Sequence, residues 1–136
     1  MVRQGWRGHL WQERFHSFVM DEGYLMHAAR YGALNPVAAG LVARPEEWRW
    51  SSARAHSVGR DDRVVRVRPL LDRVGDWRTF IEGGIEAVMA KRLDQHLQTE
   101  RPLGSDDWIA ALEQRLGRPL AAKRPGRPRK QATDHE

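Results

Sequence analysis

The stretch that decides the fold is DEGYLMHAARYGALNPVAAG, residues 21–40. Its first residue, Asp21, can accept hydrogen bonds from the free amides of a first helical turn, so a helix is expected from Glu22 to about Leu34. Residues four positions apart share one face of a helix. One stripe of this helix therefore carries His27, Tyr31 and Asn35.

The pair Asn35-Pro36 predicts the end of this helix. Asparagine is a common cap, and proline suits the first turn of a helix because its missing amide needs no partner there. A break is therefore expected at this pair, followed by a short helical turn through residues 37–39 that ends at Gly40.

The flanking segments predict one strand and several helices. Apolar and polar side chains tend to alternate from Phe15 to Val19, which favours a strand. A strand needs pairing partners, and this sequence hardly offers any. The charged stretch 59–68 is expected to be an exposed connection or a weak strand. Helical regions are expected at 53–57, 77–98 and 105–117, the second of them weakened by Gly83-Gly84. Two tryptophans, Trp48 and Trp50, are expected to pin a loop to the core.

Length and composition fit one modest domain with a tail. The chain has 136 residues and no cysteine, which excludes disulfides and thiolate zinc sites. It has no run of about 18 apolar residues, so no membrane partner is expected from a spanning segment and a soluble, cytoplasmic protein is the prediction. Of its charges, residues 118–136 hold 6 Lys/Arg and 2 Asp/Glu, against 17 and 16 in residues 1–117. A basic arm on a balanced domain predicts a polyanionic partner, nucleic acid before an anionic membrane, or else a solvated terminus.

Composition alone identifies no catalyst. A tyrosine on a helix, such as Tyr31, can pack, form a hydrogen bond or act as a nucleophile. Asn35 can likewise cap a helix or supply a functional amide.

Longer motifs narrow these alternatives. Three segments stand in order, Gly8-His9-Leu10-Trp11-Gln12-Glu13-Arg14-Phe15, then YGALNPVAAGLV at residues 31–42, then PEEWRWSS at residues 45–52. In sequence and spacing they resemble the later half of the REP-associated tyrosine transposases, single-tyrosine members of the HUH family. The likeness covers residues 5–57 well and extends more loosely over residues 103–120.

The resemblance implies a chemistry and a fold. A helix tyrosine of that family attacks a phosphate of single-stranded or hairpin DNA and forms a phosphotyrosine link, a role that falls on Tyr31. Asn35, one turn later, would orient the tyrosine or complete the shell of a divalent metal, magnesium or manganese. The implied fold is α+β, here a truncated small antiparallel sheet flanked by helices and dominated by them. Both monomers and dimers fit the resemblance.

The chain departs from the family at the metal. The family's metal ligands are two histidines separated by one bulky residue, and no His-x-His occurs in this sequence. The chain is therefore expected to begin about halfway through a complete enzyme, to bind no cofactor and to be inactive alone. A non-catalytic DNA-binding remnant is the alternative, and a decayed product that folds poorly is a third.

Three parts are expected: residues 1–60 as the later half of a transposase-like catalytic domain, 61–117 as a helical extension that is helix-turn-helix-like or a plain hairpin, and 118–136 as a disordered basic tail. Arginine beside proline and glycine suits the narrow minor groove of A·T-rich duplex DNA, and Gly126-Arg127-Pro128 is similar to the core of AT-hook peptides. Pro125 stands where those peptides have a basic residue. The residues expected to bind DNA are Lys123, Arg124, Arg127, Arg129 and Lys130.

Overall fold

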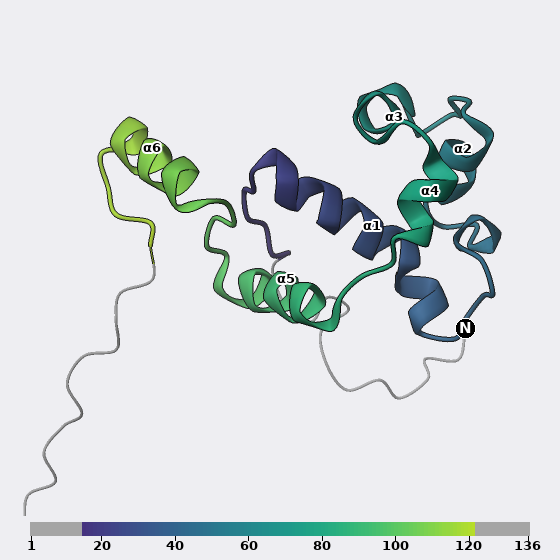
Figure 1. Ribbon diagram of the computed structural model, residues 1–136, viewed down its shortest axis with the longest axis horizontal. Coiled ribbons are helices and arrows are strands. Elements are labelled where there is room, and N and C mark those ends of the chain that lie inside the picture. The colour runs from purple at the N-terminus through teal and green to yellow at the C-terminus, as the bar shows by residue number, and fades with distance from the viewer. Residues whose placement is uncertain (1–14, 122–136) are drawn as a thin grey trace, which may run out of the picture.

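Regular structure in residues 15–121, the part of the chain that the computed structural model describes, is helical (Figure 1). The predicted strand and antiparallel sheet are absent from these residues, whereas the prediction that helices dominate is confirmed. The predicted disordered tail, residues 118–136, lies outside this range from residue 122 onward. The elements are α1 Glu22–Ala38, the 3-10 turn η1 Pro45–Glu47, α2 Ala53–Val58, α3 Arg68–Val74, α4 Trp77–Glu82, α5 Ala87–Thr99 and α6 Asp106–Leu116.

The segment predicted as a strand forms one bridge and no ladder. Met20 pairs with Leu103 in parallel. The Leu103 amide donates to the Val19 carbonyl at 2.9 Å, and the Asp21 amide donates to the Leu103 carbonyl at 3.0 Å. Leu103 lies in the short link between α5 and α6, where no second residue forms a bridge. The α+β prediction is therefore wrong for the described residues, because a strand without a partner strand gains no ladder of hydrogen bonds.

Helix α1 begins as predicted and ends later than predicted. The Asp21 carboxylate accepts the Tyr24 amide at 2.9 Å and caps the first turn. The helix then continues through Asn35 and Pro36 to Ala38, so the predicted break is wrong. Pro36 is buried, and the carbonyl that loses its helical partner belongs to the exposed Gly32. Burial of the proline ring and hydration of that carbonyl offset the missing hydrogen bond.

The core lies where α1, α2 and α4 meet. Its buried members combine two alanines with two large rings: Ala33, Ala53, Trp77 and Phe80. The alanines leave room for the rings of α4 to approach α1 and α2. The Trp77 ring also stacks on buried His56 of α2, with centroids 4.9 Å apart and planes at 18°. The Nδ1 atom of His56 lies 2.8 Å from the Ser52 carbonyl, so this polar side chain is buried with a partner.

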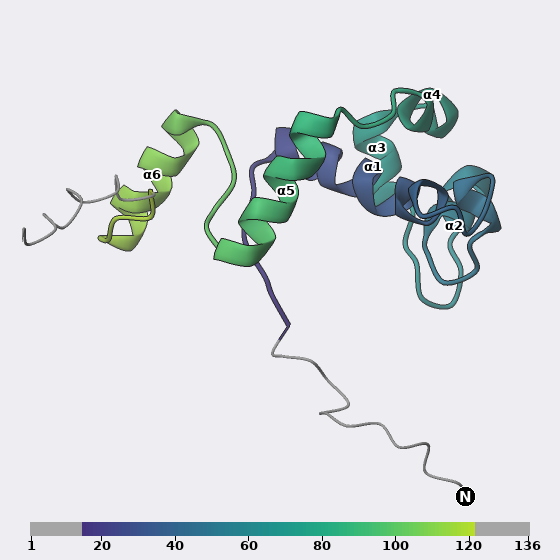
Figure 2. The same ribbon diagram turned by 90° about the horizontal axis from the view of Figure 1, so that it is seen from below.

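The helical region predicted over residues 77–98 is two helices, because Gly83 and Gly84 separate α4 from α5. Gly84 has a positive φ of 61°, and a Cβ at Gly83 would lie 3.1 Å from the Arg30 guanidinium carbon. That guanidinium donates to the Gly84 carbonyl at 3.2 Å and lies 4.6 Å from the centre of the Phe80 ring. The break lets α5 turn back and lie along α1 (Figures 1 and 2).

Helix α6 lies at the end of the molecule away from α2 and α3 (Figure 1). Ser105 caps it by accepting the Trp108 amide at 3.3 Å, as the sequence predicts. The Ser105 amide in turn donates to the second carboxylate oxygen of Asp21 at 2.9 Å, so one carboxylate joins the starts of α1 and α6. None of the helices formed by residues 15–121 is long and apolar enough to cross a membrane.

Candidate functional site

Tyr31, the predicted nucleophile, lies half-buried on α1 where α5 runs beside it. Its hydroxyl donates a hydrogen bond to Oδ1 of Asp94 at 3.1 Å. This bond to Asp94 raises the pKa of Tyr31 above its usual value, with a further contribution from burial. A raised pKa makes the phenol harder to deprotonate than an ordinary tyrosine, which is the opposite of what a nucleophile needs.

The Asp94 carboxylate orients the phenol and does not deprotonate it. A phenol and a carboxylic acid differ by about six units in reference pKa, so proton transfer from Tyr31 to Asp94 is strongly unfavourable in the resting molecule. The contact was not predicted from the sequence. The two residues are 63 positions apart, and an acidic residue on a helix carries no signal of its partner.

The other tyrosine of the chain, Tyr24, also meets α5. Arg92 donates to the Tyr24 hydroxyl at 2.7 Å, and its guanidinium carbon lies 5.5 Å from the centre of the Tyr24 ring. Two charged side chains of opposite sign, Arg92 and Asp94, thus hold the two tyrosines of α1. This pairing fixes how α5 lies along α1 and, with it, the direction of the Tyr31 hydroxyl.

Asn35 has different surroundings from Tyr31, although both lie on α1 one turn apart. Asn35 is exposed and lines a cavity of about 340 Å³ together with Pro36, Leu41, Trp48 and Trp50. Tyr31 is not among the residues that line this cavity. The four-residue spacing correctly predicts that both lie on one stripe of α1, but the structure gives each side chain its own environment.

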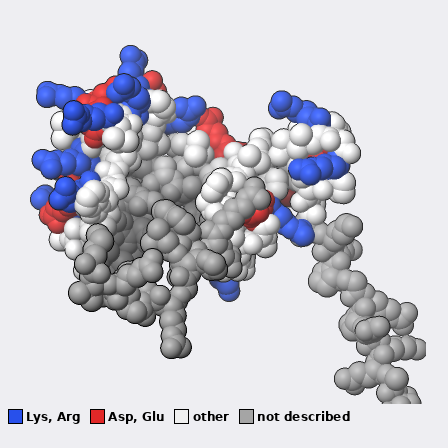
Figure 3. Space-filling model, turned by 180° about the vertical axis from the view of Figure 1, so that it is seen from behind, with Lys and Arg blue, Asp and Glu red and all other residues white. Residues whose placement is uncertain are grey.

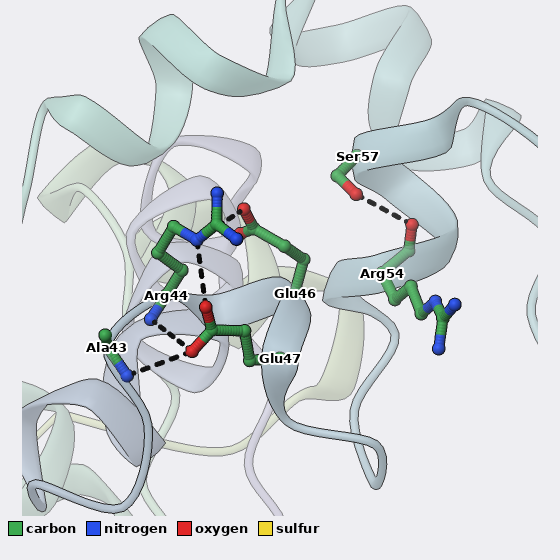
Figure 4. A network of polar contacts seen from close by, with 6 residues as sticks. All are labelled: Ala43, Arg44, Glu46, Glu47, Arg54 and Ser57. Carbon is green, nitrogen blue, oxygen red and sulfur yellow. Dashed lines mark hydrogen bonds and ion pairs between the residues drawn. The ribbon is translucent and has the colours of Figure 1, made fainter.

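The loop that carries the two tryptophans is held in place by Glu47. Its carboxylate accepts the Ala43 amide at 3.2 Å, the Arg44 amide at 3.3 Å and Nε of Arg44 at 3.0 Å (Figure 4). The hydrogen bond from Arg44 is the main cause that lowers the pKa of Glu47. These bonds fix η1, and the chain leaves it with Trp48 half-buried and Trp50 73% exposed. The prediction that both tryptophans pin the loop to the core is therefore wrong for Trp50.

Among the described residues, the side chains around Tyr31 and Asn35 do not form a ligand set for a divalent metal. Residues 15–121 contain no group of three or more His, Cys, Asp and Glu side chains arranged to hold one. The nearest histidine on the same stripe of α1, His27, lies beside the Tyr24 ring at 6.4 Å between centroids. Accordingly, no chemical step is assigned to a metal in this chain.

Basic side chains gather at the end of the molecule that holds α2 and α3, with acidic side chains among them (Figure 3). Several of the arginines are paired, such as Arg44 with Glu47, Arg66 with Asp61 and Arg68 with Asp72. This surface is therefore mixed in sign and does not form a continuous basic stripe. The five basic residues predicted to bind DNA, Lys123 to Lys130, lie outside the residues that the structure describes.

Comparisons of this chain with known protein families, with curated proteins and with solved structures found no match. Its function must therefore be argued from its own residues.

The Tyr31–Asp94 pair can be tested by titration. We expect Asp94→Asn to lower the pKa of Tyr31, because the substitution removes the negative charge and weakens the acceptor while keeping the shape of the side chain. The measurement is the ultraviolet absorbance of tyrosinate against pH in a Tyr24→Phe background, where Tyr31 is the remaining tyrosine.

Since the pKa of Tyr31 is raised in the folded chain, its bond to Asp94 stabilises the fold below the unfolded pKa near 10. This contribution is lost as the pH rises through the folded pKa. The control is Asp72→Asn, which removes an equal charge on α3; the assignment is wrong if both variants leave the titration unchanged.

Proposed function

We propose that this chain is a DNA-binding protein of the REP-associated tyrosine transposase kind, with Tyr31 at the nucleophile position and Asn35 as its helper. The observation that supports this most directly is the unbroken helix α1, which keeps Tyr31 and Asn35 one turn apart on a helix braced by α5. Tyr31 is the first residue of a segment that carries the family resemblance, residues 31–42. Its phenol is also half-buried and oriented by a hydrogen bond to Asp94. The partner is DNA, single-stranded or folded into a hairpin.

The isolated chain is proposed to bind DNA without cleaving it. In strand cleavage by a tyrosine, the phenol oxygen bonds to phosphorus and the phenol gives its proton to water. The bond from phosphorus to a deoxyribose oxygen breaks, and that oxygen takes up a proton from water to leave as a hydroxyl. Charge on the phosphate and on the phenol oxygen must be neutralised for this to proceed. The 136-residue sequence lacks His-x-His, and the raised pKa of Tyr31 favours the protonated phenol.

A non-catalytic DNA-binding remnant is the second candidate, and one observation favours it. Asp94 places a negative charge against the Tyr31 hydroxyl, where an incoming phosphate would be repelled. An active enzyme needs this contact to open, whereas a remnant can keep it as a structural contact. The two candidates differ in whether the Tyr31 hydroxyl ever becomes linked to DNA.

One experiment addresses both statements. The full chain is incubated with a labelled single-stranded hairpin in magnesium or manganese, and samples are run on native and denaturing gels. We expect a retarded complex on the native gel and no covalent adduct on the denaturing gel, for the chain as it stands and for Tyr31→Phe alike. Absence of any complex at low salt contradicts the DNA-binding proposal. An adduct that disappears in Tyr31→Phe contradicts only the statement that the isolated chain is inactive, and it identifies Tyr31 as the nucleophile.

A further inference from the structure

An exposed tryptophan beside the Asn35 cavity is the feature of this surface that packing does not explain. Trp50 is 73% exposed, although a tryptophan ring is among the side chains that gain most from burial. The segment before it is held by the Glu47 bonds, and the Ser51 amide donates to the Trp48 carbonyl at 3.3 Å, so hydrogen bonds anchor the backbone on both sides of Trp50. Trp50 and exposed Leu41 line one hollow together, and exposed apolar side chains that adjoin one another, rather than single ones, are typical of a recognition surface.

A cation accompanies the ring. The guanidinium carbon of Arg49 lies 4.4 Å from the centre of the Trp50 ring, while Trp50 also contributes to the wall of the cavity. Within the described residues Arg49 has no ion-pair partner, so its charge is available to a ligand. An aromatic face next to an arginine is the combination that binds single-stranded nucleic acid, because the ring stacks on a base and the cation attracts the adjacent phosphate.

The cavity supplies the remaining parts of a base-binding site. Its volume of about 340 Å³ is at the small end of the range for ligand pockets. Pro36, Leu41 and Trp48 give it apolar walls. The Asn35 side chain, which no described residue engages in a hydrogen bond, adds two N–H donors and a carbonyl acceptor at the rim. Donors and an acceptor on one amide can pair with the edge of a base.

The geometry points to a binding site for one unpaired DNA base in this cavity, with Trp50 stacking on the base, Arg49 holding a neighbouring phosphate and Asn35 contacting the base edge. The inference rests on the proposed function, since it names the part of the DNA that this surface binds. Asn35 follows Tyr31 by one turn of α1. A strand anchored here is held on the helix that carries Tyr31, which gives the site the task of placing single-stranded DNA on α1.

The test compares strands with and without bases. One probe is a labelled oligothymidine about ten nucleotides long, and the other is the same backbone with abasic residues, both measured by fluorescence anisotropy with the full chain. Stacking of one base on an aromatic ring corresponds to about 5- to 150-fold in affinity. We expect the full chain to prefer oligothymidine by a factor in this range and Trp50→Ala to lose that preference while binding the abasic strand unchanged. Trp50→Phe keeps an aromatic ring and should retain part of the preference for oligothymidine.

Two further variants separate the contributions. Arg49→Ala should weaken binding of both strands and flatten the slope of log affinity against log salt by about 0.7, the value for one phosphate contact on a single strand. Phe15→Ala removes another exposed ring, 77% exposed, and should change neither affinity. Circular dichroism of each variant establishes that the helices are retained.

The outcomes distinguish this inference from the proposal on which it rests. If Trp50→Ala keeps the preference for oligothymidine, or weakens both strands equally, the base-binding site is wrong while the DNA-binding proposal stands. If the full chain binds neither strand nor a hairpin at low salt, both are wrong.

Discussion

Replacing Trp77 with alanine is expected to lower the free energy of unfolding by about 3–5 kcal/mol, the cost of deleting a large buried ring. Trp77 is 9% exposed and touches two other rings, His56 at 4.9 Å and Phe80 at 5.6 Å between centroids. Because it joins α4 to α2, its removal leaves a cavity between these two helices. The expected loss is a large part of the roughly 5–15 kcal/mol that stabilises a typical domain.

Trp50→Ala is the matched control for Trp77→Ala. It deletes the same side chain at a position that is 73% exposed and should change the free energy of unfolding by less than about 0.5 kcal/mol. The measurement is urea unfolding followed by far-ultraviolet circular dichroism, which does not depend on tryptophan emission. Trp77→Phe keeps a ring against His56 and should fall between the two, which leaves a measurable variant if Trp77→Ala does not fold. Equal unfolding midpoints for Trp77→Ala and Trp50→Ala would contradict this account of the core.

Features that depend on neighbouring residues were predicted correctly from the sequence. Asp21 and Ser105 each cap a helix through an amide three positions ahead. Gly117, with a positive φ of 64°, ends α6 where the glycine predicts an end. A cap or a left-handed residue acts within one turn, so a local pattern is enough to identify it. Helix α3 was not predicted because such a local pattern is missing at its start. Its N-cap residue, Val67, offers no side-chain hydrogen bond.

Features that depend on distant contacts were predicted wrongly or not at all. The pair Asn35-Pro36 has the local pattern of a break, yet packing carries α1 through it because Ala33 and Pro36 are both buried. The predicted antiparallel sheet came from the family resemblance, and residues 15–121 supply a single bridge at Met20.

In the candidate site, too, the features set by local spacing were predicted and those set by distant contacts were not. Tyr31 and Asn35 were placed one turn apart by periodicity, which the helix confirms. Asp94 is 63 positions from Tyr31 in the sequence, and Trp50 is 15 positions from Asn35. No spacing rule predicts that either pair meets in the folded chain. The contact with Asp94 bears most on the chemistry of the site, because it gives the Tyr31 hydroxyl a carboxylate acceptor and raises the pKa of that hydroxyl.

The basic C-terminal segment is expected to dominate the affinity of the chain for duplex DNA. Residues 122–136 contain five of the cations, Lys123, Arg124, Arg127, Arg129 and Lys130, while residues 1–117 are nearly balanced. If each cation displaces one counterion, the slope of log affinity against log salt should be roughly −4 to −5, since one contact contributes about −0.9. Affinity should then fall roughly 250- to 1000-fold between about 50 mM and 200 mM salt. Fluorescence anisotropy with labelled duplexes over a salt series measures the slope.

The structure sets where the segment should be cut. The amides of Leu120 and Ala121 donate to the Glu113 carboxylate at 2.6 Å and 2.9 Å, which lowers the pKa of Glu113 and holds the chain against the end of α6. A chain that ends at Ala121 keeps these bonds and loses the five cations, so any change in DNA binding comes from charge and not from a damaged helix. We expect this truncation to flatten the slope and to weaken binding on most sequences alike.

A pair of single substitutions tests whether the segment also reads the minor groove. Arg127 lies between Gly126 and Pro128, whereas Arg129 lies outside the Gly-Arg-Pro motif. If both act through phosphates, Arg127→Ala and Arg129→Ala should each reduce the slope by about 0.9 on any duplex. If Arg127 enters an A·T-rich minor groove, where the negative potential is strongest, Arg127→Ala alone should weaken A·T-rich duplexes more than G·C-rich ones. Equal binding by the full chain and the chain that ends at Ala121 at low salt would contradict both roles, because the balanced charge of the remaining domain would then account for all of the affinity.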